Sequence, residues 1–187
     1  DEIILRAHTT VREKFPDTLL IIAPRHPVRG AEILELARKA GFSSALESAG
    51  RPVTKATDVW IADILGGLGL YYTFSDIVFV GDSLLDTSDG HNPMEAARLS
   101  SAILSGPNVA SFTETYDILK RDGAAAVTDG EHELARDVIS LLSDPRKLAE
   151  MRGRAFRSAE REAGVLERAR EKLRPLLRTI TDGGVIY

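Results

Sequence analysis

The chain has 187 residues, of which 43% are hydrophobic and 28% are charged, a composition typical of one globular domain with a sizeable core. Its 28 acidic and 24 basic residues give a net charge of −4, so bulk electrostatics provide no reason to expect nucleic-acid binding. The absence of cysteine excludes disulfide bonds, a thiol nucleophile and cysteine-ligated zinc.

The first residues have the pattern of an amphipathic helix that ends near Lys14, and they lack the regions of a secretory signal. Because the chain begins with Asp1 and not with methionine, we expect a fragment or a processed chain. No apolar run approaches the roughly 20 residues that a membrane-spanning helix needs. We therefore expect this chain to be soluble.

Beyond this helix, strand and helix patterns alternate, which predicts an α/β fold with a Rossmann-like, doubly wound parallel sheet and helices on both faces. The first strand is apolar throughout and is expected to be fully buried. The expected strands are residues 19–23, 44–46, 58–62, 77–80, 102–104 and 124–127. The expected helices are residues 29–40, 65–74, a helix from 92, 112–121 and a helix to 142 with Asp129 as N-cap.

The whole chain, residues 1–187, is predicted to form a single domain. An α/β core covers residues 1–143, and a helical tail covers residues 144–180. Pro145 is suited to the first turn of this tail, and Gly164 predicts a break in it.

The tail is basic: residues 144–178 carry a net charge of +5, against −9 for the rest of the chain. A basic helix of this kind can face anionic lipid. The interpretation that we favour is a solvated helix face, supported by spaced pairs such as Glu150 with Arg154 and Glu171 with Arg174.

The strand at 77–80 leads through a polar loop to a helix start that can bind a ligand. In open α/β sheets, ligands bind outside the carboxyl ends of strands, where helix N-termini present free N–H groups. Asn92 as N-cap, Pro93 at the first helical position and Glu95 can form a capping box, and the Glu95 carboxylate can equally accept hydrogen bonds from the two hydroxyls of a ribose. Together with Met94, these residues are a candidate phosphate and ribose site.

Two other candidate contacts also follow strands. Pro24 and Arg25 come directly after the first strand, and arginine is suited to phosphate because its planar fork donates two parallel hydrogen bonds. A solvated turn is the alternative. Leu65, Gly66 and Gly67 form a turn that lets a nucleotide approach the backbone, although a simple strand-to-helix turn explains the glycines about as well.

The polar loop also carries acidic residues and a possible nucleophile. Asp82, Asp86 and Asp89 do not have the spacing of a calcium loop, so we expect them to be loop and turn residues. Residues 81–84, Gly-Asp-Ser-Leu, match the nucleophile block of a GDSL-type esterase.

In that hypothesis, Ser83 is the nucleophile and Asp129 and His132 supply the Asp-x-x-His pair. The order of the motifs argues against it, because that family usually has its block at the first strand and the pair near the domain end. The esterase is kept as an alternative, and otherwise Ser83 lines the crevice.

Taken in order, the motifs resemble those of a known family. They are the segments 24–27, 66–71, 81–84, 90–95 and 105–107, which span about 100 residues. Each is weak alone, but their ordered combination is similar to the C-terminal half of the 3-deoxy-D-manno-octulosonic acid (Kdo) transferases.

This resemblance implies a GT-B glycosyltransferase, in which two Rossmann-like domains face a cleft. Such an enzyme transfers Kdo from CMP-Kdo to the lipid A precursor in lipopolysaccharide synthesis, by an inverting displacement without a metal or cofactor. The chain would be the donor-binding half. The acceptor domain, with the general base and the membrane-associating segment of a protein at the cytoplasmic face of the inner membrane, would be absent.

An isolated chain of this kind should bind CMP without transferring sugar. A non-catalytic nucleotide-sensing module is the other alternative. Carried over from the family, the nucleotide site comprises Pro24, Arg25, Leu65, Gly66, Gly67, Ser83, Asn92, Pro93, Met94 and Glu95.

Three departures from the family pattern bear on this site. The family has glutamate where this chain has Gly67, and glycine where it has Asp82 and Asp89. The resemblance therefore implies that one carboxylate near the nucleotide is lost and two others are gained. Two extra carboxylates beside an anionic donor should weaken its binding unless they point away.

Overall fold

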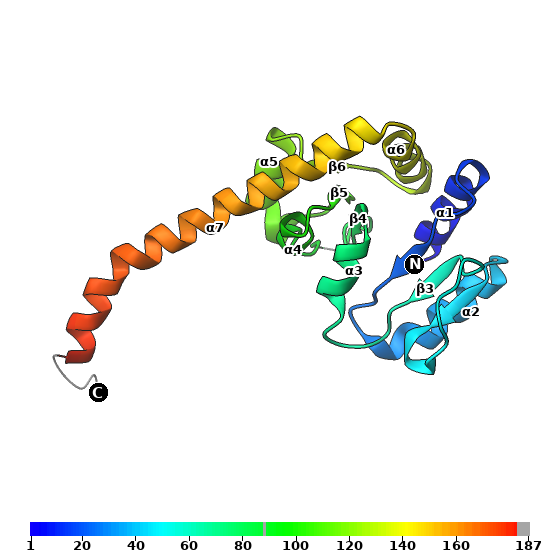
Figure 1. Ribbon diagram of the computed structural model, residues 1–187, viewed down its shortest axis with the longest axis horizontal. Helices are drawn as coiled ribbons and strands as arrows, with labels where there is room; N and C mark the ends of the chain where they lie inside the picture. The colour runs from blue at the N-terminus through cyan, green and yellow to red at the C-terminus, as the bar shows by residue number, and fades with distance from the viewer. Residues whose placement is uncertain (88, 183–187) are drawn as a thin grey trace.

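The computed structural model describes residues 1–87 and 89–182, with the side chains of the last stretch, 165–182, left undescribed. Figure 1 shows how the elements follow one another along the chain. The strands are β1 (Leu20–Ile22), β2 (Ser44–Leu46), β3 (Val59–Ile61), β4 (Ile77–Val80), β5 (Ala102–Ser105) and β6 (Ala125–Val127). The helices are α1 (Glu2–Lys14), α2 (Gly30–Lys39), α3 (Leu68–Phe74), α4 (Met94–Arg98), α5 (Thr113–Arg121), α6 (Glu131–Ser143) and α7 (Pro145–Asp182), with 3₁₀ turns η1 (Pro27–Arg29), η2 (Glu47–Ala49) and η3 (Ala110–Phe112).

All strand pairs are parallel, as the alternating sequence pattern predicts. The strands form two three-stranded sheets, ordered β1-β3-β2 and β4-β5-β6, where the sequence predicts a single sheet. Because the strands within each sheet are parallel, their carboxyl ends lie at one edge. The predicted α/β class is confirmed.

The first strand differs from its prediction as a fully buried element. Each residue of β1 is only partly buried. The reason is its position, because β3 is the central strand of this sheet and β1 lies at one side of it. Apolar composition alone does not distinguish an edge strand from a central one.

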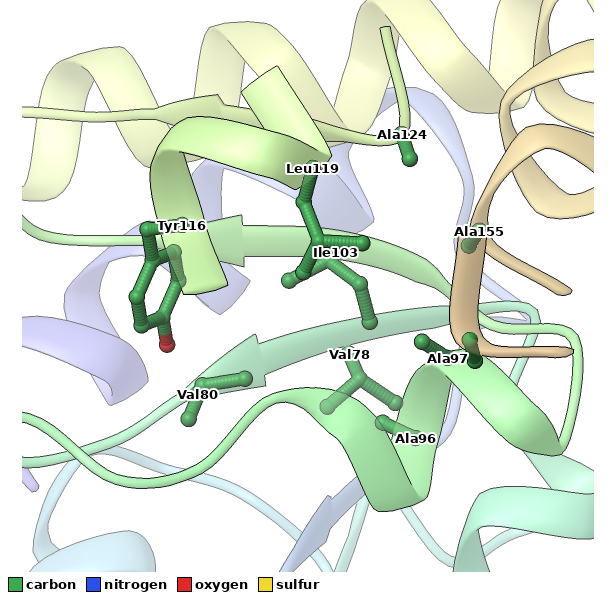
Figure 2. Close-up of a cluster of buried hydrophobic side chains, with 10 residues drawn as sticks. Val78, Val80, Ala96, Ala97, Ile103, Tyr116, Leu119, Ala124 and Ala155 are labelled. Atoms are coloured by element: carbon green, nitrogen blue, oxygen red, sulfur yellow. The ribbon is translucent and has the colours of Figure 1, made fainter. Parts of the chain in front are cut away.

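Helices cover both faces of the second sheet. Alternate side chains of β4 and β5 enter two separate cores, as the two-residue period of a strand requires. Figure 2 shows Val78, Val80 and Ile103 on the face that packs against α4, α5 and α7. Ala102 and Leu104 of β5 belong to the opposite core, with residues of α1 and α6.

The first turns of α7 are part of the core. Ala155 and Ala159 are buried with Ala96 and Ala97 of α4, and these small side chains let the two helices approach closely. Figure 2 shows Ala155 of α7 together with Ala96 and Ala97. Figure 1 shows the rest of α7 extending away from the sheets. The sequence pattern does not reveal that α7 packs against the core. Its buried positions there are alanines, and they stand among the many charged residues that give the tail its net charge of +5.

The predicted break in α7 at Gly164 is wrong, since the helix runs from Pro145 to Asp182 without interruption. A glycine inside a helix costs only about 1 kcal/mol relative to alanine, which the surrounding helix formers offset. The predicted pair of Glu150 with Arg154 is present at 3.6 Å. The predicted pair of Glu171 with Arg174 lies outside the described side chains.

Two helix starts test the capping predictions. Asp144 accepts a hydrogen bond from the Lys147 N–H at 3.0 Å, immediately before Pro145, as expected for this start. The prediction of Asp129 as the N-cap of α6 is wrong, because Gly130 occupies the cap position with φ +85° and the Asp129 side chain makes no cap hydrogen bond.

None of the helices in the described part of the chain combines the length and apolarity that a bilayer crossing needs.

Candidate functional site

The predicted site residues follow β1, β3 and β4, and the remaining ones lie at the start of α4. Pro24 is half-buried after β1, and Arg25 beside it is exposed, so its guanidinium is accessible to a ligand. Leu65 is 82% exposed on the turn that leads from β3 to α3. Because these positions succeed parallel strands, they lie at the edge where α/β proteins bind their ligands.

The link between the turn and α4 is a close approach of two segments. A side-chain carbon at Gly69, in the first turn of α3, would lie 3.8 Å from Oε1 of Glu95. Glu95 is exposed and stands next to this glycine. The structure therefore brings the first turn of α3, which directly follows the Gly66–Gly67 turn, close to the Glu95 carboxylate.

The start of α4 lies two residues later than predicted. Oδ1 of Asn92 accepts the N–H of Met94 at 2.9 Å, and Pro93 between them is buried. The return hydrogen bond from Glu95 that a capping box needs is not formed among the described residues. Pro93 occupies the N-cap position of α4, so the prediction of Asn92 as N-cap is wrong by one residue, although the Asn92 side chain does accept an N–H of the first turn. Without the return bond, the Glu95 carboxylate is able to accept hydrogen bonds from a ligand.

Ser83 is a buried structural residue. Its hydroxyl donates to the carbonyl of Val80 at 2.7 Å and accepts the N–H of Gly106 at 2.8 Å. Its carbonyl accepts the N–H of Asn108 at 2.9 Å. With 1% of its surface exposed, Ser83 connects the loops after β4 and β5, and any role in nucleotide binding is through their positions.

The esterase hypothesis finds no support in this geometry. A serine nucleophile needs a histidine base within hydrogen-bond reach. The side chain of His132 is 93% exposed at the start of α6, and its Nε2 lies 3.8 Å from Oε1 of Glu131. The hydroxyl of Ser83 is already engaged with two backbone groups.

The loop between β4 and α4 is closed at its base by backbone contacts. The N–H of Gly90 donates to the carbonyl of Asp82 at 2.6 Å, and Nδ1 of His91 lies 3.1 Å from the carbonyl of Gly81. Asp82 has φ +56°, in the left-handed region that favours glycine. This conformation explains why glycine suits position 82. Both Asp82 and Asp89 are exposed.

Replacing Asp82 by glycine is expected to raise the free energy of unfolding by about 0.5–1 kcal/mol, because glycine adopts positive φ without steric cost. Urea unfolding measures this change. Asp82→Asn is the matched control, since asparagine tolerates the left-handed region but removes the charge. If Asp82→Gly unfolds at a lower urea concentration than wild type, the backbone at this position does not explain the preference for glycine.

The turn before α3 contains the third departure from the family pattern. Gly66 has φ +87°, which delays the start of α3 from the predicted residue 65 to Leu68. A side chain at Gly67 would overlap the hydroxyl of Tyr71. That hydroxyl donates to Oε2 of Glu47 at 2.5 Å. This chain therefore lacks a carboxylate at position 67 itself, but the carboxylate of Glu47, from the end of β2, lies nearby through its bond to Tyr71.

Glu47 is a residue that our sequence reasoning missed. It directly follows β2, whose predicted bounds, Ser44–Leu46, the structure confirms. The rule that ligand contacts follow strands would have selected it. The next residue, Ser48, donates from its N–H and its hydroxyl to the carboxylate of Asp63, at 2.9 and 2.6 Å. These bonds tie the ends of β2 and β3 together.

Two further features of the described residues bear on the site. A cavity of about 390 Å³ is lined by residues 110–115 at the start of α5, and none of the predicted site residues lines it. Within the described part, no three histidine, aspartate or glutamate side chains are grouped to hold a metal ion. The expectation of a metal-free site stays a prediction.

Comparison with known proteins identifies relatives of this chain, although no family model matches it. The 3-deoxy-D-manno-octulosonic acid transferase of Haemophilus influenzae is 32% identical over 178 residues, 95% of this chain and 42% of the relative. The probable mitochondrial 3-deoxy-D-manno-octulosonic acid transferase of Arabidopsis thaliana is 34% identical over 151 residues, 79% of this chain and 34% of the relative. The chain thus spans less than half the length of these two relatives.

A solved structure agrees with these relatives. The crystal structure of the C-terminal CMP-Kdo binding domain of WaaA from Acinetobacter baumannii matches with a TM-score of 0.79 and 26% identity. The match covers 84% of this chain and 82% of that domain. The sequence matches and the shared architecture lead to one conclusion: the chain belongs to the 3-deoxy-D-manno-octulosonic acid transferase family and corresponds to its C-terminal domain.

Proposed function

We propose that this chain is the donor-binding domain of a glycosyltransferase that moves Kdo from CMP-Kdo to the lipid A precursor in lipopolysaccharide synthesis. The observation that carries the proposal is the match over 84% of the chain to a domain described as CMP-Kdo binding. The arrangement of Arg25, the Gly66–Gly67 turn and Glu95 at the carboxyl ends of the strands supports it.

Each of these groups has a chemical role toward CMP. The guanidinium of Arg25 donates paired hydrogen bonds to the phosphate and offsets its charge. The glycine turn lets the nucleotide approach the backbone. The carboxylate of Glu95 accepts hydrogen bonds from the ribose hydroxyls. The phosphate and the ribose of the nucleotide are thereby held by residues from different parts of the fold.

In the complete enzyme, a hydroxyl of the acceptor attacks the anomeric carbon of Kdo, and the bond from that carbon to the phosphate oxygen of CMP breaks with inversion. A general base takes the hydroxyl proton, and CMP leaves with the bonding electrons. Arg25 stabilises the negative charge on the leaving phosphate. The base and the acceptor site would belong to the part of the relatives that this chain does not span, so the isolated chain binds CMP without catalysing transfer.

The setting of the whole protein follows from the same proposal. An acceptor as hydrophobic as a lipid A precursor stays in a membrane, so the complete enzyme would associate peripherally with the cytoplasmic face of the bacterial inner membrane. The donor is a soluble nucleotide sugar, and no metal is needed because Arg25 supplies the positive charge at the phosphate.

Calorimetric titration with CMP tests the site. Arg25→Ala and Glu95→Ala should each weaken CMP binding by about tenfold or more, because hydrogen bonds to charged groups contribute about 1.5–3 kcal/mol. Arg38→Ala, which removes an exposed arginine near the end of α2, is the matched control and should bind like wild type.

Two further ligands separate the roles. Arg25→Ala should leave the affinity for cytidine unchanged, because cytidine lacks the phosphate. Glu95→Ala should abolish any preference for CMP over 2′-deoxy-CMP, because the carboxylate then no longer reads the ribose. A wild-type chain that does not bind CMP would show the proposal to be wrong, and two variants that bind like wild type would show the site assignment to be wrong.

A further inference from the structure

Glu47 presents a carboxylate beside the glycine turn. It follows β2 at the same sheet edge as the candidate site, and it is only partly buried. One oxygen, Oε2, accepts the hydroxyl of Tyr71 at 2.5 Å. The other oxygen receives no hydrogen bond from the described side chains. A carboxylate held at one oxygen and free at the other is placed to accept a hydrogen bond from a ligand.

The partner that fixes this carboxylate is itself rigid. Tyr71 is 3% exposed, and its ring packs edge-on against Trp60, with 5.4 Å between the ring centroids. Burial, together with the nearby Glu47 carboxylate, raises the pKa of Tyr71 to about 12. The hydroxyl therefore stays protonated and acts as the hydrogen-bond donor to Glu47. The absence of a side chain at Gly67 leaves the space that the hydroxyl occupies.

Glu47 and Glu95 approach the start of α3 from opposite sides. Tyr71, which holds Glu47, lies against Gly67, whereas Glu95 lies against Gly69. Successive helical residues are about 100° apart, so positions 67 and 69 face nearly opposite directions. A nucleotide that binds across this start, with its ribose at Glu95 and its base on the other side, would bring the base to Glu47.

We propose that Glu47 is a specificity-determining residue that accepts a hydrogen bond from the exocyclic amino group of cytosine. The inference rests on the proposed function, since it assumes that the nucleotide occupies the edge between Arg25 and Glu95. A carboxylate suits this amino group because it offers acceptors and no donor, the same pairing that carboxylates make with cytosine in nucleic acids. Uracil carries a carbonyl oxygen at the same position, and the carboxylate repels it. The site thus selects CMP against UMP.

The test compares CMP and UMP binding to the full chain by calorimetry. Wild type should bind CMP at least about tenfold tighter than UMP, in line with the discrimination of about 1–3 kcal/mol expected of a well-placed base contact. Glu47→Gln should bring the two affinities to within a few-fold of each other, because an amide can donate to the uracil carbonyl as well as accept from the cytosine amino group. Glu35→Gln, on an exposed position of α2, is the matched control.

A second variant and a second readout keep the test independent of folding. Tyr71→Phe should reduce the preference for CMP without abolishing it, because Glu47 remains but loses the bond that orients it. Trp60, the single tryptophan of the chain, contacts Tyr71, so CMP binding should change its fluorescence in wild type and in Glu47→Gln. That signal also verifies that each variant is folded.

The outcomes separate the two proposals. If wild type prefers CMP and Glu47→Gln retains the full preference, or if wild type binds UMP as tightly as CMP, Glu47 does not read the base, whereas the phosphate and ribose site still stands. If wild type binds neither nucleotide, both the proposed function and this inference fail.

Discussion

Replacing Gly106 by alanine is expected to lower the free energy of unfolding by about 4 kcal/mol. A side-chain carbon at this position would overlap the backbone carbonyl of Ser83 and lie 2.8 Å from the N–H nitrogen of Leu84. Overpacking of this kind costs about 3 kcal/mol when rigid backbone must move. The movement also breaks the hydrogen bonds that Ser83 makes with Gly106 and Asn108, which adds about 1 kcal/mol.

This loss is a large fraction of the roughly 5–15 kcal/mol that stabilises a typical domain. Urea unfolding at constant pH measures it. Gly81→Ala is the matched control: the glycine follows β4 at the same edge, yet a side-chain carbon there meets nothing within 4 Å. The control should change the stability by less than about 1 kcal/mol. If the two variants unfold at the same urea concentration, the approach of the two loops is not as close as the structure has it.

The same contact explains why Ser83 could not be interpreted from the sequence. A Gly-x-Ser-Leu segment after a strand is compatible with a nucleophile, a ligand contact and a structural serine. The distinction depends on Gly106, which is more than 20 residues away along the chain and meets Ser83 only because β4 and β5 are neighbours. Local patterns predict strands, but they do not predict which loops touch.

The elements themselves were largely predictable. The bounds of β2 and β4 match their predictions. For β4 the reason is a short apolar run between turn residues, whereas β2, Ser-Ala-Leu, has a weaker local pattern. The errors fall at predicted helix boundaries, where the conformation of a glycine determines whether the helix begins, ends or continues. Gly66 and Gly130 adopt positive φ and delay α3 and α6, whereas Gly164 stays inside a helix. Glycine permits all of these conformations, so the sequence cannot choose among them.

The candidate site was predictable to the same extent. The rule that ligand contacts follow parallel strands selects Arg25 and the Gly66–Gly67 turn, and the structure places both at the expected edge. The same rule also selects Glu47, which directly follows β2. It does not predict the hydrogen bond that fixes this carboxylate, because the donor, Tyr71, belongs to another element. The carboxylate that is absent at position 67 is supplied nearby by Glu47 only because of tertiary contacts, which the sequence alone does not show.

The second large effect concerns His8, whose burial should make the stability depend on pH. His8 lies on α1 with 5% of its surface exposed, and its ring packs against Phe42 with 5.2 Å between centroids. Nε2 is 3.2 Å from the carbonyl of Asp58 and donates to it. Burial lowers the pKa of His8 from 6.5 to about 4. The hydrogen bond and the Asp58 carboxylate raise it less, and Arg12, the ion-pair partner of Asp58, lowers it further.

The direction of the effect follows from proton binding. In the unfolded chain, His8 takes up a proton as the pH falls below 6.5, but in the folded chain it does so only near pH 4. The unfolded state therefore binds more protons in this interval, so the free energy of unfolding falls as the pH is lowered. A shift of this size corresponds to about 3 kcal/mol at 1.36 kcal/mol for each pKa unit, fully lost at about pH 4 and fully present above pH 6.5.

His8→Gln isolates this contribution, because glutamine keeps an N–H donor for the Asp58 carbonyl but does not titrate. Urea unfolding between pH 7 and about 4 should give a curve of stability against pH that is flatter for His8→Gln than for wild type, by up to about 3 kcal/mol across the interval. Carboxylate groups titrate in both proteins and cancel in the difference. His132→Gln, whose parent side chain is 93% exposed, should follow the wild-type curve. Parallel curves for wild type and His8→Gln would mean that the folded state admits a charged His8, and hence that water reaches the ring between α1 and Phe42.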